Sequence, residues 1–167
     1  MSKVYVISDT HFGHKKIITF GIKQREFKTI EEHDKAIVER WNSVVTKHDT
    51  VWHLGDVFFG KDGHWILAGL NGNKKLVMGN HDHYPIDIYK TYFSHIYGAA
   101  EYDGCLLTHI PVHKDHLRPR WRKNIHGHLH TSIVSMSHGG PDPEYVCASA
   151  EHSNLTPRLM HELTRSL

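Results

Sequence analysis

The sequence predicts an α/β fold in which a second, strand-rich sheet packs on a first, mainly parallel one. Two observations lead to this prediction. The first half of the 167-residue chain alternates strand-like and helix-like segments, which is typical of parallel βαβ units. The second half holds short strand-like segments joined by turns. Because no repeat, low-complexity tract or linker divides the chain, we expect residues 1–167 to form a single domain.

The first half is expected to contain strands at residues 4–8, 50–54 and 75–78, which are short, apolar and followed by polar or glycine residues. A helix is expected over residues 30–45, because apolar residues recur there at helical spacing. Thr29 and Glu32 form a capping box at its start. A second, short helix is expected over residues 65–70, with Gly72 just past its end.

The second half is expected to be mostly strands. Its strand-like segments are residues 96–99, 101–102, 105–108, 124–126, 133–136 and 145–150. A closing helix is expected over residues 157–167. This pattern adds a second sheet to the βαβαβ unit of the first half.

Composition narrows the class of protein. The hydrophobic fraction of 39% is ordinary for a globular domain, and no apolar run approaches the ~20 residues that span a bilayer. The N-terminus lacks the pattern of a signal peptide, and Cys105 and Cys147 are expected to be buried thiols. We therefore expect a cytoplasmic protein without a membrane partner. A net charge of +2 neither requires nor excludes nucleic acid, and nothing indicates the oligomeric state.

Potential metal donors follow five of the predicted strands. Ligands of open α/β sheets bind at the carboxyl ends of the strands, so side chains at these positions are expected to converge. Two residues of an extended chain that are two positions apart point to the same side, as the pairs Asp-x-His and His-x-His require. The donors are Asp9, His11, Asp56, Asn80, His109, His128 and His130.

The ordered set Asp-x-His, Gly-Asp, Gly-Asn-His-Asp, His and Gly-His-x-His resembles the motifs of the calcineurin-like metallophosphoesterases. The wording of residues 8–14 and 51–56 is most similar to the small, single-domain prokaryotic and phage members. The resemblance implies a four-layer α/β/β/α sandwich of two mixed sheets flanked by helices. It also implies that Asp9, His11 and His130 hold one metal, that Asn80, His109 and His128 hold another, and that Asp56 bridges both.

The implied chemistry is hydrolysis of a phosphate ester. Two divalent ions about 3.5–4 Å apart lower the pKa of a shared water, so that a bridging hydroxide exists near neutral pH, and they neutralise phosphate oxygens. His81 is expected to be catalytic, by stabilising the transition state and protonating the leaving oxygen. Nitrogen and oxygen ligands without thiolate suit Mn²⁺, Fe, Zn²⁺ or Ni²⁺, and we favour Mn²⁺.

The sequence departs from the phosphoprotein-phosphatase branch, which carries Gly-Asp-x-x-Asp-Arg. Here Asp56 is followed by Val57, Phe58 and Phe59, so protein-phosphatase activity is not expected and the group that orients His81 is left open. Asp82 is one candidate, although neighbouring residues at a strand end point apart.

Substrate contacts are predicted at two places. His14 either overhangs the site or is a polar loop residue. The basic segment 114–123 either rims the pocket or is a solvated loop. In the first case its arginines meet phosphate and its tryptophan stacks on a base. The residues concerned are Arg118, Arg120, Trp121 and Arg122.

Three functions remain open. The leading one is a phosphodiesterase acting on a small or exposed ester, such as a cyclic nucleotide or a nucleic-acid end. The second is a phosphomonoesterase or pyrophosphohydrolase that uses the same metals. The third is a non-catalytic scaffold, which is disfavoured because no predicted ligand has been lost.

Overall fold

A five-stranded sheet forms the base of the molecule. In the computed structural model, which describes residues 2–165, its strands lie in the order β4-β3-β2-β1-β9. The four strands β1 to β4 run parallel, and the short β9 pairs antiparallel with β1. Their bounds are β1 Val4–Ile7, β2 Thr50–His53, β3 Asn73–Val77, β4 His95–Tyr97 and β9 Arg158–Leu159.

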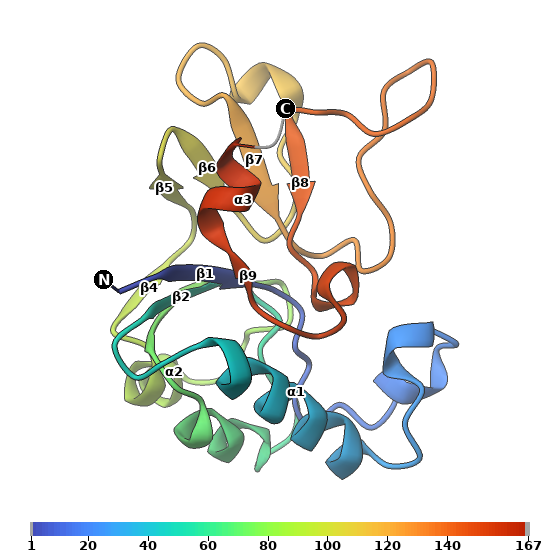
Figure 1. The fold of residues 1–167 in the computed structure, drawn as a ribbon, viewed down its shortest axis with the longest axis vertical. Helices are drawn as coiled ribbons and strands as arrows, with labels where there is room; N and C mark the ends of the chain where they lie inside the picture. Colours follow the sequence, from blue (N-terminus) through green and yellow to red (C-terminus); the bar gives the residue numbers. More distant parts are fainter. Residues whose placement is uncertain (1, 166–167) are drawn as a thin grey trace.

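A four-stranded sheet stands above the first one (Figure 1). Its order is β5-β6-β7-β8, with β5 antiparallel to β6 and the other pairs parallel. The bounds are β5 Ala100–Tyr102, β6 Cys105–Leu107, β7 Lys123–His126 and β8 Tyr145–Cys147. Apolar residues of both sheets, including Val6, Trp52, Leu107 and Ile125, meet in one buried cluster between them.

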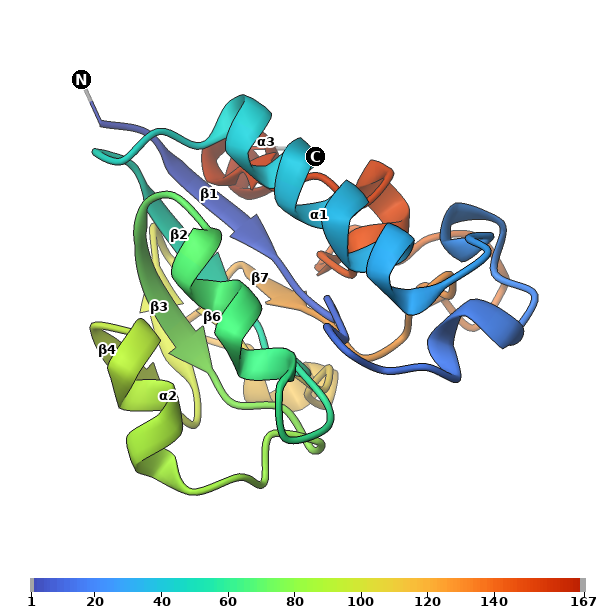
Figure 2. The ribbon, with the colours of Figure 1, turned by 90° about the horizontal axis from the view of Figure 1, so that it is seen from below.

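Helices cover the lower face of the first sheet, as Figure 2 shows from below. They are α1 Ile30–Val44, the 3-10 helix η3 Gly63–Gly69 and α2 Ile86–Tyr92. The helix α1 begins where the sequence predicts, because the Thr29 side chain accepts a hydrogen bond from the backbone N–H of Glu32. A second buried cluster joins these helices to the sheet through Ile37 and Trp41 of α1.

The last helix, α3 Met160–Arg165, packs on the other side, where Met160 and Leu163 enter the cluster between the sheets. The fold is therefore the predicted α/β sandwich of two mixed sheets flanked by helices. Short 3-10 turns complete the loops: η1 Ile17–Thr19, η2 Lys23–Arg25, η4 Lys114–His116 and η5 Ala150–Ser153. Among residues 2–165, no helix has the length and apolar character needed to cross a bilayer.

Three elements differ from the sequence predictions. Residues 133–136 make only an isolated bridge between Ser135 and Pro141, because this exposed excursion finds no neighbouring strand. The helix α2 was not predicted, since its seven residues are too few for a clear helical period. The closing helix begins at Met160 rather than residue 157, because Arg158 and Leu159 pair with β1 first. Residues 166 and 167 of that prediction lie outside the described residues.

Candidate metal centre

The predicted donors at the five strand ends come together at the junction of the two sheets. Two groups of three have ligand atoms that all lie within 4.8 Å of one another. One group comes from β1 and from the loop after β7, and the other joins the ends of β1, β2 and β6. The groups are Asp9, His11 and His130, and Asp9, Asp56 and His109.

Asp56 belongs to the second group and also lies close to His11 of the first. Its Oδ2 is 3.6 Å from Nε2 of His11, and its Oδ1 is 3.4 Å from Nε2 of His109. The side chain is 2% exposed, so it is held away from bulk water. The two carboxylate oxygens therefore face imidazoles of different groups.

Asn80 and His128 lie beside the second group. Asn80 Oδ1 is 2.9 Å from Nε2 of His109. The rings of His128 and His109 are 5.2 Å apart, edge to face, and the backbone N–H of His128 donates to Oδ2 of Asp9 at 2.9 Å. The structure thus brings all seven sequence-predicted donors into one region.

Two of the imidazoles have their tautomers fixed by neighbouring acceptors. Nδ1 of His109 donates to the carbonyl oxygen of Leu54 at 2.7 Å, and Nδ1 of His130 donates to Oε1 of Glu151 at 2.8 Å. An acceptor at Nδ1 orients the ring and directs Nε2 away from that acceptor, which is the arrangement of many metal-binding histidines.

The backbone at the site is strained. Eight non-glycine residues have positive φ among residues 2–165, and five of them are predicted donors. The left-handed region costs most L-residues about 1–2 kcal/mol each, and such strain clusters at functional sites. These five, with φ between 51° and 70°, are Asp9, His11, Asp56, His128 and His130.

Burial and neighbouring side chains together set the charge states of His11 and Asp9 in the first group. Burial lowers the pKa of His11 despite the nearby carboxylates, so its ring stays neutral. Burial by itself raises the pKa of Asp9, but the neighbouring His11, His109 and His130 outweigh it and hold the pKa well below its usual value. A neutral imidazole beside an ionised carboxylate is the form that binds a cation.

His81 and His14 stand at the open side of the donor cluster. Nε2 of His81 is 4.0 Å from Oδ2 of Asp56, and its side chain is 47% exposed. His14 stacks on Phe59 with ring centres 4.1 Å apart, and its Nδ1 is 3.2 Å from Nδ1 of His11. Burial and the adjacent His11 and His81 lower the pKa of His14 to about 4, so it is neutral at pH 7. The Phe59 ring also contacts those of His11 and His81, 5.0 and 5.3 Å away.

Asp82 faces away from His81. Its carboxylate accepts hydrogen bonds from the backbone N–H groups of Asp56, Val57 and Gly79, at 2.8, 2.9 and 2.8 Å. The residue therefore ties the loop after β2 to the loop after β3. Its suggested role as the group that orients His81 finds no contact to support it.

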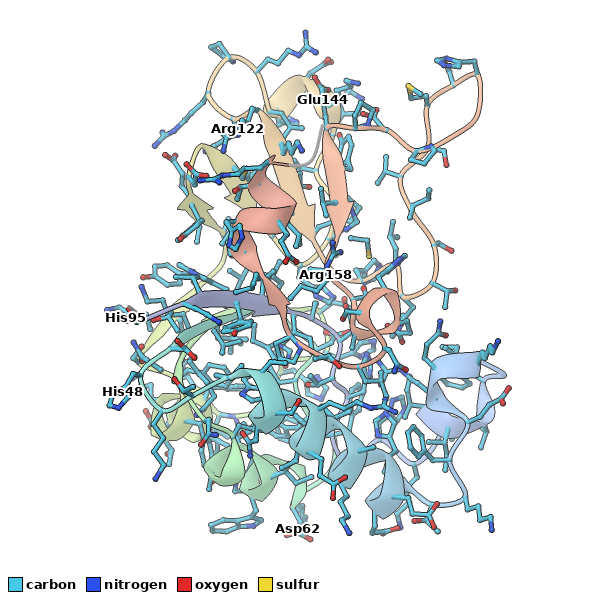
Figure 3. All side chains as sticks on the ribbon, in the orientation of Figure 1. His48, Asp62, His95, Arg122, Glu144 and Arg158 are labelled. Atoms are coloured by element: carbon cyan, nitrogen blue, oxygen red, sulfur yellow. The ribbon has the colours of Figure 1, made fainter. Side chains whose placement is uncertain are left out.

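The basic segment lies elsewhere than predicted. Arg122 pairs with Asp103 at the turn that precedes β6, whereas the predicted donor His109 follows β6. Figure 3 shows Arg122 and Glu144 at the end of the second sheet that points away from the first. The other three side chains also contact carboxylates: Arg118 pairs with Glu144, Arg120 pairs with Glu101, and Trp121 donates a hydrogen bond to Glu101. The structure therefore corrects the expectation that Arg118, Arg120, Trp121 and Arg122 rim the pocket.

Gly127 allows the second sheet to approach Asp9. A Cβ at this position would lie 1.9 Å from Oγ of Ser8 and 2.6 Å from Oδ2 of Asp9. We expect Gly127→Ala to weaken metal uptake and to lower the free energy of unfolding by about 1–3 kcal/mol, as overpacking does. Metal titration and urea unfolding check this. Gly98→Ala, where an added Cβ meets nothing within 4 Å, is the matched control. Equal behaviour of the two variants would contradict the prediction.

His53 is a buried structural histidine. It is 0% exposed, its Nε2 donates to Oγ1 of Thr10 at 2.9 Å, and its Nδ1 accepts from the N–H of Gly55 at 3.2 Å. Burial lowers its pKa to about 3. Between that value and the unfolded value of about 6.5, only the unfolded chain takes up the proton, so acid destabilises the fold.

The metal-free protein should therefore lose unfolding free energy as the pH falls from 7 to 4, by up to about 1.4 kcal/mol per pH unit through His53. Urea unfolding at several pH values measures the slope. His53→Gln should give a shallower slope. The same substitution at the exposed His48, labelled in Figure 3, should leave the slope unchanged. Parallel slopes in all three proteins would refute the assignment.

Sequence reasoning missed three side chains at the site. Phe59 appears only as an apolar loop residue in the sequence. Arg25 and Glu151 are buried beside the donors and paired at 2.6 Å, but they are 126 positions apart. No local pattern connects two charged residues at such a separation, so only the fold could find them.

The chain is similar in sequence to proteins from a phage and an archaeon. No family model matches it. The gene 66 protein of Mycobacterium phage L5 is 31% identical, with 83% of this chain and 82% of the phage protein covered. The uncharacterized protein MJ1445 of Methanocaldococcus jannaschii is 35% identical, with 79% and 72% covered.

One solved structure shares the fold over the whole chain. The crystal structure of AQ665, a protein of unknown function from Aquifex aeolicus, aligns over 100% of both chains with 28% identity and a TM-score of 0.79. A Vps29 mutant from Entamoeba histolytica aligns more weakly, with 20% identity and a TM-score of 0.45 over 89% of this chain and 74% of that one. From its sequence relatives, the chain belongs to the same protein family as the gene 66 protein of phage L5 and MJ1445.

Proposed function

We propose that this protein is a dinuclear metal-dependent phosphoesterase of the calcineurin-like type that favours phosphodiesters. The observation that carries the proposal is the convergence of acidic and histidine side chains into two groups that share Asp9, with Asp56 of the second group also close to His11 of the first. Paired N/O donor sets of this kind suit two divalent ions, and we favour Mn²⁺ over Fe, Zn²⁺ or Ni²⁺.

The donor set fits a pair of metals in two respects. Oδ1 of Asp9 and Nε2 of His11 are buried and have no hydrogen-bond partner among residues 2–165, as expected of atoms kept for another ligand. Ligand atoms about 2.0–2.2 Å from one ion are roughly 3 Å apart. The 2.9 Å between Asn80 Oδ1 and His109 Nε2 agrees with that spacing.

In the proposed arrangement, Asp9, His11 and His130 would hold one ion. Asn80, His109 and His128 would hold the other, and Asp56 would bridge the pair. When bound, the two ions supply an activated water and neutralise the phosphate oxygens.

Two histidines near the proposed ions would act on the substrate. The ring of His81 is half exposed, its Nε2 is 4.0 Å from Oδ2 of Asp56, and its backbone N–H donates to Oδ1 of Asp56 at 3.0 Å, so it stands at the open side of the proposed ions. It would protonate the leaving oxygen. His14, neutral and stacked on Phe59, would contact the ester as a hydrogen-bonding partner.

The diester preference has one structural support. An arginine at the site is the usual grip on a doubly charged monoester. Among residues 2–165, Arg118, Arg120 and Arg122 are paired with carboxylates away from the donors. The position of these three guanidinium groups away from the donors favours a phosphate that carries a single negative charge, as in a nucleotide diester.

Metal-reconstituted turnover tests the proposal. The Mn²⁺-loaded protein should hydrolyse bis(p-nitrophenyl) phosphate faster than p-nitrophenyl phosphate, and a chelator should remove both activities. Faster turnover of the monoester would instead favour the phosphomonoesterase alternative. A protein that binds two ions but turns over neither ester, nor a pyrophosphate or cyclic nucleotide, would favour the scaffold.

A further inference from the structure

A buried ion pair lies directly behind the first donor group. Arg25 is 0% exposed and Glu151 is 3% exposed, and Nε of Arg25 donates to Oε1 of Glu151 at 2.6 Å. Burying two charges costs several kcal/mol per ion unless further hydrogen bonds satisfy them. Such a pair is weak evidence for stability, so the place of its other hydrogen bonds indicates what it does.

Those hydrogen bonds lead to the predicted donors. Oε1 of Glu151 also accepts from Nδ1 of His130 at 2.8 Å. Nη1 of Arg25 donates to the carbonyl oxygen of Thr10 at 3.3 Å, and Nη2 donates to that of Asp9. The pair therefore joins the segment Asp9–His11, which follows β1, to His130, which follows β7.

The guanidinium is itself held from behind by α1. Nη1 of Arg25 donates to Nε2 of His33 at 2.8 Å, and Nδ1 of His33 donates to Oδ1 of Asp34 at 2.8 Å. The other oxygen of Asp34 accepts the backbone N–H of Gly13 at 2.8 Å. The chain of contacts thus returns to the loop that carries His11 and closes a rigid frame around it.

We infer that Arg25 and Glu151 are positioning residues for one metal ion of the two, the ion assigned to Asp9, His11 and His130. Glu151 fixes the His130 tautomer and turns its Nε2 toward the ion. Arg25 clamps the carbonyls of Asp9 and Thr10 and so holds a segment whose Asp9 and His11 have positive φ. This inference rests on the proposed function and goes beyond it, because it assigns a supporting network to one ion alone.

The second ion has separate support. Asp82 holds the loops of Asp56 and Gly79, and the Leu54 carbonyl fixes His109. Among residues 2–165, the hydrogen bonds of Arg25 and Glu151 reach none of these groups. A change in the ion pair should therefore weaken the binding of the ion assigned to Asp9, His11 and His130 and leave the binding of the other ion unchanged.

Two variants test the inference through metal binding instead of activity. Glu151→Gln keeps the shape and the Oε1 acceptor but removes the charge. Arg25→Lys keeps the charge but loses the forked donors that reach two carbonyls at once. Isothermal titration of Mn²⁺ into the metal-free proteins should show two ions for wild type. In each variant, one ion should bind about 10–100-fold more weakly and the other should be unchanged.

Electron paramagnetic resonance gives an independent reading. At one to two equivalents of Mn²⁺, wild type should show the exchange-coupled spectrum of a pair, and the variants should show isolated Mn²⁺. Asp49→Asn is the matched control, because Asp49 is a 3% exposed carboxylate at the opposite ends of β1 and β2. It accepts from the N–H groups of Lys3 and Thr46 at 2.7 Å each. This variant should have a lower melting temperature than wild type and should still bind both ions with wild-type affinity.

The outcomes separate the two proposals. If wild type binds two ions and both variants bind them with wild-type affinity, the positioning role is overturned and the proposed function stands. If the variants lose both ions equally, the selective role is likewise overturned. If wild type takes up no divalent ion, the proposed function fails and this inference fails with it.

Discussion

Asp56→Asn is expected to abolish phosphodiesterase turnover, with a loss of more than about 10³-fold. The carboxylate faces His11 with one oxygen, 3.6 Å away, and His109 with the other, 3.4 Å away. An amide replaces one of these oxygens with an NH₂ group, which is a donor and cannot bind a cation. Loss of a single charge-stabilising donor already costs an enzyme about 10²–10³-fold, so loss of the shared ligand should cost more.

The fold should survive this change. Asparagine tolerates the positive φ of 57° at this position, and Asp82 still holds the backbone N–H. The amide can keep accepting the His81 N–H, and it removes a charge that repels Asp9. Turnover and metal content are the measurements. Asp142→Asn, at a buried carboxylate that pairs with Lys114, is the control and should keep both. Full activity of Asp56→Asn with two bound ions would refute the bridging role.

His81→Ala is expected to lower kcat by about 10²–10⁴-fold for a diester with an alkyl leaving group. The reason is that an alkoxide leaves poorly unless it receives a proton. Metal content should not change, because the His81 ring is 47% exposed and belongs to neither group of buried donors.

Leaving-group dependence distinguishes proton donation from a structural effect. p-Nitrophenolate departs without a proton, so the loss should be much smaller for bis(p-nitrophenyl) phosphate than for an alkyl ester. An equal loss for both esters would contradict the assignment. His83→Ala is the matched control, since His83 is exposed two positions along the same loop and stacks on Tyr84.

Most of the fold could be predicted from the sequence because its strands and helix ends are marked by residues that lie close together along the chain. The strands β1, β2 and β3 each contain apolar residues and are each followed by a predicted donor, and Thr29 marks the start of α1. The elements that were predicted wrongly have no clear pattern among neighbouring residues. Residues 133–136 are mostly apolar, as in many strands, but a strand also needs a neighbour. The sequence does not show whether one is present.

The same distinction applies to the site. Asp9 and His109 could be selected because each follows a predicted strand, and the carboxyl ends of parallel strands meet. The partner of His130 could not, since Glu151 is a common charged residue whose burial arises only when β8 and η5 bring it beside Arg25. The prediction that the basic segment 114–123 rims the pocket was wrong because it relied on composition alone. Its composition suggested phosphate, but Arg118 and Arg122 are paired with acids at the starts of strands.

The positive φ angles at the donors have a consequence for the evolution of this family. Replacing His11, His128 or His130 with glycine would relieve the backbone strain at that position. Mutations that raise the stability of the fold would therefore tend to remove residues of the pocket. A chain released from selection for binding would therefore be expected to shed these histidines early. The left-handed backbone at these histidines is therefore a stability cost that this fold carries together with the pocket.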